Sequence, residues 1–278
     1  MAGPYRLDRA LIRVSGPDAV PFLDNLLTQD VTRLAEAGVL YAALLTPQGK
    51  AIADMLLWND AGDGVLLETA PARAADLVRR LAMYKLRAQV RIEDVSRQFP
   101  VLWSPERFPS AAADPRLPEL GWREVSALPP EQINLPAGEE AFDALRLALG
   151  VPDLARDAQA EEVFALEALL EELNGVDFRK GCFVGQENVS RMKRRATTRK
   201  KFCPIEFAGE APAYGAPILA GAAEVGAVRS GAHGRALALV RLDRAAGQRL
   251  SVDGREVRLA PPSWLILPGG GDAAGAPD

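Results

Sequence analysis

Histidine and cysteine are scarce in this sequence, which contains only His233, Cys182 and Cys203. A structural zinc site normally takes four Cys or His ligands and a cubane iron–sulfur cluster takes four thiolates, so the chain can complete neither alone. Two cysteines are also too few for a disulfide framework, which favours a reducing compartment. We therefore expect no metal site of the protein's own.

The single histidine leaves little scope for Ser-His-Asp or Cys-His catalysis. His233 lies in Gly231-Ala-His-Gly234, and glycines on both sides are typical of a turn. We interpret His233 as a turn residue and look for chemistry elsewhere.

Long apolar runs are also missing. No run approaches the ~20 residues needed to span a membrane, and the first residues lack the apolar core of a secretory signal. We expect a cytoplasmic protein without membrane association. The net charge of −4 argues against a dedicated nucleic-acid binder, because such domains are usually basic overall.

The remaining composition, 48% hydrophobic and 25% charged, is typical of a globular protein, and 278 residues allow one large domain or two to three small ones. Apolar runs and turns within residues 1–100 predict an α+β unit, a meander of strands backed by helices. The predicted strands cover 11–14, 39–45, 51–58, 65–68 and 89–95, and the predicted helices begin at Ala19 and Pro71.

Residues 101–200 predict a second α+β unit that carries the stretch Lys180–Glu187. Its predicted elements are strands at 101–103 and 121–125, an apolar element at 143–149 that contains Arg146, and an amphipathic helix over 161–173 that stops at Asn174-Gly175. From 201 to 267, short apolar runs alternate with Gly, Pro and Asp-Gly turns, which predicts a small antiparallel β-barrel. Residues 268–278 are rich in Gly, Ala and Pro and are predicted to form a disordered tail.

The stretch Lys180–Glu187 combines a cation, a thiol, two glycines and an amide–carboxylate pair. Core packing has little use for this mixture, because only Phe183 and Val184 bring sizeable apolar area. Glycine lets the backbone approach a ligand closely or adopt a positive φ. We interpret the stretch as a binding loop around which the chain is organised.

Cys182 is the candidate reactive group of this loop. It lies beside Lys180 and just ahead of a predicted helix start at Gly185-Gln-Glu, and a nearby ammonium and a helix N-terminus both stabilise a thiolate. Most cysteines in protein cores are inert, but the glycine-flanked position favours a functional thiol. Cys203 lies in an apolar run, and we interpret it as structural.

A basic run follows the loop, with cations at Arg191, Lys193, Arg194, Arg195, Arg199, Lys200 and Lys201. A solvated surface is the usual explanation of such a run. Its place directly after the loop also makes it a candidate site for an anionic ligand tail or for RNA phosphates. Only one aromatic residue, Phe202, is close, so stacking of bases has little support.

Two carboxylates fall in otherwise apolar segments. Asp54 lies within the predicted strand 51–58, where it either faces solvent or stands ready to pair with a basic nitrogen of a ligand. Glu167 falls in the apolar stripe of the predicted helix, where a carboxylate is costly unless it is paired or bound to a ligand.

Lys180-Gly-Cys-Phe-Val-Gly-Gln-Glu187 resembles the signature of the YgfZ-type folate-binding proteins. These belong to the superfamily of the glycine-cleavage T-protein, a tetrahydrofolate-dependent aminomethyltransferase. Three further parts of the chain, within residues 5–265, resemble the same family. The N-terminal pattern is Leu27-Thr-Gln-Asp-Val-Thr32 with Ala42-Ala-Leu-Leu-Thr-Pro-Gln-Gly-Lys50, the lead into the signature is Asn174-Gly-Val-Asp-Phe-Arg-Lys180, and the C-terminal barrel is resembled by Gly226-Ala-Val-Arg-Ser230 with Ala236-Leu-Ala-Leu-Val-Arg-Leu242.

The resemblance implies a T-protein-like α+β fold, in which ferredoxin-like subdomains surround a central channel and a C-terminal antiparallel β-barrel closes it. It implies tetrahydrofolate or a one-carbon derivative as the cofactor. It also implies a role in the assembly or repair of iron–sulfur enzymes, including enzymes that modify tRNA. The expected partners are these client enzymes or the assembly machinery, and we expect a monomer without direct RNA binding.

The resemblance also assigns roles to residues. Glu167 matches the pterin-recognising glutamate of the T-protein, and Asp54 falls at the strand that carries its catalytic acid. The T-protein has no cysteine in the signature loop, so Cys182 points to the iron–sulfur group. We predict Cys182 and Asp54 as catalytic residues. The predicted folate-binding residues are Lys180, Gly181, Phe183, Gly185, Gln186, Glu187, Glu167, Arg191 and Arg146.

Three functions are compatible with these residues. The favoured one is an accessory factor for iron–sulfur proteins, with the pterin of folate near Asp54 and Glu167, the acidic tail near Arg191 or Lys193, and Cys182 as the reactive group. The second is an aminomethyl- or methyltransferase that uses Asp54 to steer or deprotonate an amine, although YgfZ-type proteins need not keep an acid there. The third is an RNA-binding module that uses the cations of 191–201.

Overall fold

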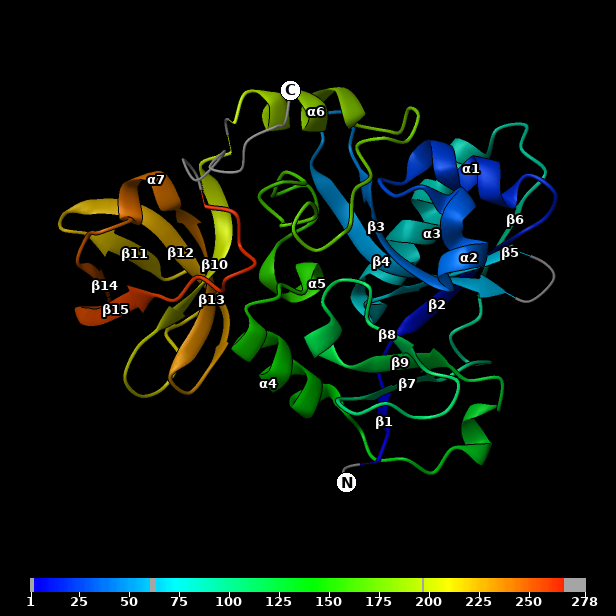
Figure 1. Ribbon diagram of the computed structural model, residues 1–278, viewed down its shortest axis with the longest axis horizontal. Helices are drawn as coiled ribbons and strands as arrows, with labels where there is room; N and C mark the ends of the chain where they lie inside the picture. Colours follow the sequence, from blue (N-terminus) through cyan, green and yellow to red (C-terminus); the bar gives the residue numbers. More distant parts are fainter. Residues whose placement is uncertain (1–2, 61–63, 197, 268–278) are drawn as a thin grey trace, which may run out of the picture.

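The computed structural model describes residues 3–60, 64–196 and 198–267, so the predicted tail at 268–278 lies outside the described residues. Figure 1 shows a sheet backed by helices at the right, a second sheet below it, and a barrel at the left. Helix α6 (Gln186–Arg194) runs along the upper edge. The predicted α+β class is confirmed. None of the described helices is long and apolar enough to cross a membrane.

The first sheet has the strand order β3-β4-β5-β2-β6, and all neighbours are antiparallel. Its strands are β2 (Ala10–Ser15), β3 (Val39–Leu45), β4 (Ala51–Asp60), β5 (Gly64–Thr69) and β6 (Arg91–Asp94). Every residue of β3 is buried, because both faces of the sheet are covered. Alternate side chains therefore serve different cores: Leu40 and Leu44 pack under the helices, whereas Tyr41 belongs to the core shared with the other units.

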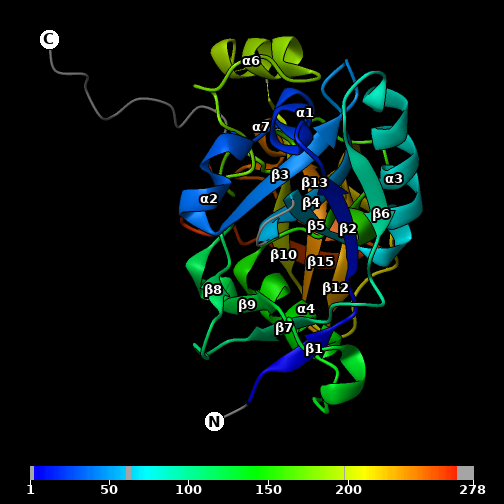
Figure 2. The ribbon, with the colours of Figure 1, turned by 90° about the vertical axis from the view of Figure 1, so that its right-hand side faces the viewer.

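Helices cover the outer face of the first sheet (Figure 2). They are α1 (Ala19–Leu26), the 3-10 helix η1 (Val31–Arg33), α2 (Leu34–Ala37) and α3 (Pro71–Lys85). The predicted helix starts at Ala19 and Pro71 are confirmed. Proline suits the first turn because an N–H group there has no partner within the helix. Ala74, Leu77 and Leu81 of α3 recur at helical spacing and are buried against the sheet.

The second sheet has the order β1-β7-β9-β8. Its strands are β1 (Tyr5–Leu7), β7 (Val101–Ser104), β8 (Ala112–Ala113) and β9 (Trp122–Val125). The 3-10 helix η2 (Pro118–Leu120) precedes β9. After β9 the chain forms η3 (Pro130–Gln132), α4 (Glu139–Leu149) and α5 (Leu154–Asp157). Tyr5 of β1 pairs opposite Trp103 of β7. A division of the chain at residue 100 therefore separates β1 from the sheet in which it pairs.

The predicted helix over 161–173 is wrong. This segment is a series of turns, with left-handed φ angles of 65° at Glu161 and 62° at Leu169. The segment lies along the start of β4 instead: the N–H of Ala51 donates to the Val163 carbonyl at 2.8 Å, and the N–H of Glu161 donates to the Ala51 carbonyl at 2.7 Å. The apolar side chains are buried as expected. Isolated turns remain, such as the bond from the Ala168 N–H to the Phe164 carbonyl at 2.9 Å, but the left-handed residues and the bonds to β4 prevent a continuous helix.

The C-terminal unit is a closed antiparallel barrel with the order β10-β13-β12-β11-β14-β15, which confirms the prediction. Its elements are β10 (Lys200–Glu206), β11 (Pro217–Ala220), β12 (Ala223–Ala232), β13 (Arg235–Arg241), α7 (Leu242–Ala245), β14 (Leu250–Val252) and β15 (Arg255–Leu259). Asp253 and Gly254 join the last two strands with φ angles of 51° and 74°. A type I′ hairpin turn requires positive φ at both positions.

Candidate functional site

The stretch Lys180–Glu187 forms the connection into α6 and packs on the turn between β3 and β4. Gly185 caps the helix with a φ of +85°, and a Cβ at this position would lie 2.6 Å from the Thr46 carbonyl oxygen and 3.0 Å from the Gly49 Cα. Only glycine fits this close backbone contact. A Cβ on Gly181 would meet nothing within 4 Å. The glycine requirement at Gly185 thus comes from packing within the protein.

Lys180 fastens this connection to the end of α1. Its side chain is 1% exposed, and Nζ lies 2.9 Å from Asp24 Oδ1. The same ammonium donates to the carbonyl oxygens of Asp24, Leu27 and Gln29 at 2.5, 3.0 and 2.8 Å. It therefore satisfies carbonyl groups that a helix leaves without partners at its C-terminus. The predicted contact of Lys180 with folate competes with these four acceptors.

The two cysteines differ sharply in accessibility. Cys182 is exposed on the connection into α6, whereas Cys203 is buried in β10. Burial raises the pKa of Cys203 to about 12, so this thiol stays protonated at neutral pH. The neighbouring Phe183 is buried in the core and supports the loop. Gln186 is half-buried and Glu187 is exposed in the first turn of α6.

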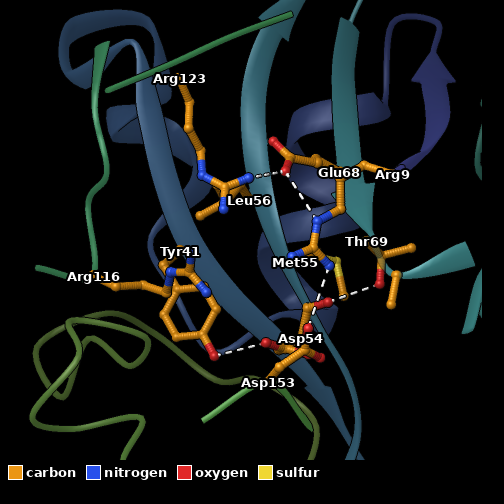
Figure 3. A pocket seen from close by; sticks show the side chains of 11 residues that line it. Arg9, Tyr41, Asp54, Met55, Leu56, Glu68, Thr69, Arg116, Arg123 and Asp153 are labelled. Carbon is orange, nitrogen blue, oxygen red and sulfur yellow. Dashed lines mark hydrogen bonds and ion pairs between the residues drawn. The ribbon is translucent and has the colours of Figure 1, made fainter. Parts of the chain in front are cut away.

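Asp54 lies at the centre of the molecule, on β4, and faces a cavity of about 30 Å³ (Figure 3). The Tyr41 hydroxyl donates to Asp54 Oδ2 at 2.9 Å, and the Thr69 hydroxyl donates to the Asp54 carbonyl at 2.9 Å. Burial, and next the negative charge of Asp153, raise the pKa of Asp54. This carboxyl group is thus held in an environment that favours its neutral form.

A network of arginines and carboxylates fills the rest of this centre. Arg116 donates to Asp114 through Nε and Nη2 at 2.9 and 2.7 Å, and Arg123 Nε donates to Asp114 at 2.9 Å. Arg116 also lies 5.5 Å from the centre of the Tyr41 ring. These side chains therefore narrow the predicted central channel at Asp54 to a half-open cavity of about 30 Å³. A pterin does not fit beside Asp54 in this arrangement, because sites for ligands of that size usually measure 300–1,000 Å³.

A groove of about 520 Å³ lies on the other side of Tyr41. It is lined by Gln29, Arg33, Leu40, Tyr41, Pro115, Glu171, Asn174, Val176, Asp177, Phe178, Arg179 and Lys193. Lys193 of α6 reaches into it: Nζ lies 3.7 Å from the centre of the Phe178 ring and 2.8 Å from Glu171. Tyr41 lines both this groove and the cavity at Asp54.

Three other predicted site residues lie away from both spaces. Glu167 accepts the Phe164 N–H at 3.0 Å, and burial raises its pKa, but it lines neither the groove nor the cavity. Arg191 bonds to Asn188 on its own helix. Arg146 is 2% exposed and joins α4 to Asp157 at 2.8 Å and to Ser230 of the barrel at 2.7 Å.

Sequence reasoning missed most of the residues that line the two spaces. Arg9 lies far from Arg116 and Arg123 in the chain, and none of the three carries a local pattern that would bring it to Asp54. Phe178 and Arg179 fall in the stretch 174–180, which was recognised only as a resemblance to the family. Among the described residues, no group of three or more His, Cys, Asp or Glu side chains is placed to hold a metal ion.

Two family models match this chain. The N-terminal domain of GCVT matches residues 9–103, and the C-terminal β-barrel domain of CAF17 matches residues 199–266. Among solved structures, the glycine cleavage system aminomethyltransferase T from Bartonella henselae superposes with a TM-score of 0.75, covering 94% of this chain and 86% of that chain. At 17% sequence identity, this similarity is evidence for the fold and not for the function. The predicted T-protein-like fold is thus confirmed.

The curated relatives are iron–sulfur cluster assembly factors. The human protein named iron-sulfur cluster assembly factor IBA57, mitochondrial, is 32% identical over 94% of this chain and 84% of its own length. The mouse protein of the same name is 30% identical over 76% of this chain and 68% of its own. A homologue from Pyricularia oryzae is 31% identical over 70% of this chain and 55% of its own.

The chain spans about half the length of the fungal relatives it matches, from Pyricularia oryzae, Neurospora crassa and Mycosarcoma maydis. It nevertheless matches 84% of the length of the human protein. The YgfZ-type assignment within the superfamily stays a prediction. On these similarities, the chain belongs to the family of the IBA57 iron–sulfur cluster assembly factors.

Proposed function

We propose that this protein is a tetrahydrofolate-binding accessory factor for the assembly or repair of iron–sulfur enzymes, including enzymes that modify tRNA. Membership of a family of iron–sulfur cluster assembly factors supports the assembly role. The observation that carries the folate part is the groove beside Tyr41, which combines aromatic rings, amides and cations in one space of suitable size. A monomer in the cytoplasm is part of the same proposal.

The groove has the chemistry that folate needs. Tyr41 and Phe178 offer aromatic faces against which a pterin or the benzoyl ring can pack. Gln29 and Asn174 supply amide groups for the polar edges of a pterin. Arg33, Arg179 and Lys193 line the same space and can pair with the carboxylates of the glutamyl tail. The pterin is therefore proposed in this groove, separated from Asp54 by Tyr41, rather than beside Asp54 and Glu167.

Cys182 is proposed as the group that contacts partner proteins, which are the iron–sulfur client enzymes or the assembly machinery. It is exposed on the segment that leads into α6, the helix that also carries Lys193. An accessible thiol can reach a cluster or a reactive group on another protein, which a buried thiol cannot. Folate in the groove and a partner at Cys182 would both contact the α6 region, which gives a physical route for one to influence the other.

A thermal-shift titration tests the folate part. Because a ligand that binds only the folded state stabilises it, tetrahydrofolate should raise the melting temperature of the wild type under reducing conditions. The Lys193→Ala variant should shift less, and Lys85→Ala, which removes an exposed lysine at the end of α3, should behave as wild type. Equal shifts in all three proteins would place folate outside the groove.

A rescue experiment tests the assembly role. In a host strain that lacks its own copy of this gene, the wild type should restore the activity of a [4Fe–4S] enzyme and the level of a tRNA modification made by an iron–sulfur enzyme. Cys182→Ser should fail to restore either, while its folate binding persists. Full rescue by Cys182→Ser would remove Cys182 from the function.

A second candidate is an aminomethyltransferase that uses Asp54. The observation in its favour is the buried Asp54 carboxyl, whose pKa is raised by burial above its ordinary value, because a carboxyl that holds its proton more readily can act in acid–base catalysis. Formation of methylenetetrahydrofolate from an aminomethyl donor, abolished by Asp54→Asn, would establish it. No product with the wild type would exclude it.

A further inference from the structure

One donor in the cavity at Asp54 has no partner. Arg123 is 1% exposed, and it pairs through Nε with Asp114 and through Nη1 with Glu68. Its Nη2 is buried without a hydrogen-bond partner among the described residues. A buried guanidinium N–H left unpaired is costly, and Arg123 lines the cavity. Arg123 therefore brings an unpaired N–H group to the lining of the cavity, and its guanidinium also lies 4.5 Å from the centre of the Phe142 ring.

The charges around the cavity balance only when Asp54 is neutral. The groups that face it are Arg9, Tyr41, Asp54, Glu68, Arg116, Arg123 and Asp153, and Asp114 pairs with two of these arginines. Three guanidinium groups thus offset the three carboxylates Glu68, Asp114 and Asp153. An ionised Asp54 would add an unbalanced negative charge, and burial already opposes this. An anion bound beside neutral Asp54 would instead carry that single negative charge, so it and an ionised Asp54 exclude each other, and the unpaired N–H of Arg123 can pair with it.

The size of the cavity limits the occupant. About 30 Å³ holds roughly one or two water molecules. A three-atom planar anion fills such a space, and its carboxylate oxygens match the donors of a guanidinium group. Acetate, the next larger carboxylate, has an additional methyl group and is therefore expected to fit this volume less well.

A neighbouring pocket offers an entry route for a small ligand to the cavity at Asp54. A pocket of about 310 Å³ on the side of α4 shares Arg9, Ala70 and Asp153 with the cavity. Arg9 is held loosely there: Nη1 lies 3.5 Å from Asp153, and Nε lies 4.0 Å from Glu68. The Arg9 side chain lines both spaces, so its movement would change the wall between the pocket and the cavity, and none of these shared residues lines the groove proposed for folate.

We propose that the cavity at Asp54 binds a one-carbon carboxylate, formate, through the free N–H of Arg123, and that Asp54 is neutral when formate is bound. This site is distinct from the folate groove and does not depend on it. Raising the pH ionises Asp54 and repels the anion, so the affinity falls about tenfold for each pH unit above the pKa of Asp54.

Saturation-transfer NMR with formate on the intact protein, from pH 5 to pH 8, tests this proposal. The wild type should bind formate at pH 5 and lose affinity as the pH rises, and acetate should bind at least tenfold more weakly. Asp54→Asn keeps an acceptor for Tyr41 but cannot ionise, so it should bind formate equally at all pH values. Arg123→Gln should lose binding, and circular dichroism shows whether it folds.

Ala70→Val provides a test that leaves the arginine network in place. The backbone at Ala70 is extended, with φ −67° and ψ 140°, which valine adopts readily. The added methyl groups enter the shared wall of cavity and pocket, and formate binding should fall at least tenfold. No binding to the wild type at pH 5 would overturn the proposal. Binding that neither Ala70→Val nor Asp54→Asn alters would also overturn it, because the site would lie elsewhere.

Discussion

Lys180 shows how a residue selected for its chemistry can have a structural role. From the sequence it is a cation beside a cysteine in a binding loop, but in the structure its ammonium is buried among four oxygen atoms at the end of α1. Nothing in the order of residues indicates that Asp24, Leu27 and Gln29 converge on one point. Only the structure therefore shows that Lys180, predicted to contact a ligand, instead holds the loop to the end of α1 through hydrogen bonds.

Removing this ammonium should destabilise the fold. Lys180→Met keeps the length of the side chain but leaves Asp24 and three carbonyl groups without their donor, so we expect a loss of about 3 kcal/mol in the free energy of unfolding. Urea denaturation measures it. The control is Lys85→Met, an exposed lysine that should change stability by less than about 0.5 kcal/mol. A Lys180→Met variant as stable as the control would show that the hydrogen bonds of Lys180 to the end of α1 do not stabilise the fold.

The two thiols should react at very different rates. Because Cys182 is exposed and the pKa of Cys203 is raised to about 12, native protein at pH 8 should take up one equivalent of an alkylating reagent. Mass spectrometry locates the label. Cys182→Ser should remove the rapid reaction and Cys203→Ala should preserve it; labelling of Cys203 in native protein would contradict the burial described here.

Asp54 and Asp114 should shape the pH dependence of stability in opposite ways. Burial alone would raise the pKa of Asp114, but Arg116 and then Arg123 lower it to about 2. Its contribution is therefore present above pH 3.8 and is lost as the pH falls towards 2, amounting to about 2 kcal/mol. The pKa of Asp54 is raised above 3.8, so its neutral form stabilises the fold at low pH and this contribution is lost as the pH rises through its folded pKa.

Urea denaturation between pH 2 and pH 8 separates these two effects. Asp54→Asn should gain stability relative to wild type as the pH rises, because the variant cannot ionise. Asp114→Asn should lose stability at neutral pH and approach the wild type near pH 2. Parallel pH profiles for wild type and Asp54→Asn would show that Asp54 is ionised in the folded protein without cost.

At the scale of elements, α3 could be predicted because its apolar side chains repeat at helical spacing, and the first sheet and the barrel could be predicted because short apolar runs are bounded by turns. The segment 161–173 could not. Its leucines recur with helical spacing, but Glu161 and Leu169 adopt left-handed φ angles and the backbone bonds to Gly49 and Ala51. Periodicity reports which side chains are buried, whereas the hydrogen-bond partners of the backbone decide the conformation.

Gly185 and Gly181 make a matched pair within one loop. Gly185→Ala places a Cβ 2.6 Å from the Thr46 oxygen at a φ of +85°, whereas Gly181→Ala meets open space. We expect a loss of about 2–3 kcal/mol for Gly185→Ala and a change below about 0.5 kcal/mol for Gly181→Ala. Urea denaturation measures both. Similar stability of the two variants would show that α6 adjusts its packing on the β3–β4 turn at little cost.

At the scale of the whole molecule, the sequence predicted the α+β class and the barrel, and the resemblance predicted the T-protein-like architecture. It did not predict how narrow the space at Asp54 is. Arg116 and Arg123 pair with Asp114 of their own segment, but Arg123 reaches Glu68, and Arg9 reaches Asp153, only after distant parts of the chain pack together. The expected channel at Asp54 is therefore a small cavity, and the larger space lies beyond Tyr41, next to α6.

The central claim is that tetrahydrofolate binds in the groove between Tyr41 and Lys193. Calorimetric titration of tetrahydrofolate under reducing conditions tests it most directly, with wild type, Lys193→Ala, Cys182→Ala and the control Lys85→Ala. The account predicts one site in the wild type, binding weakened at least fivefold by Lys193→Ala, and wild-type affinity in the other two variants. No binding to the wild type, or binding that Lys193→Ala leaves unchanged, would contradict it.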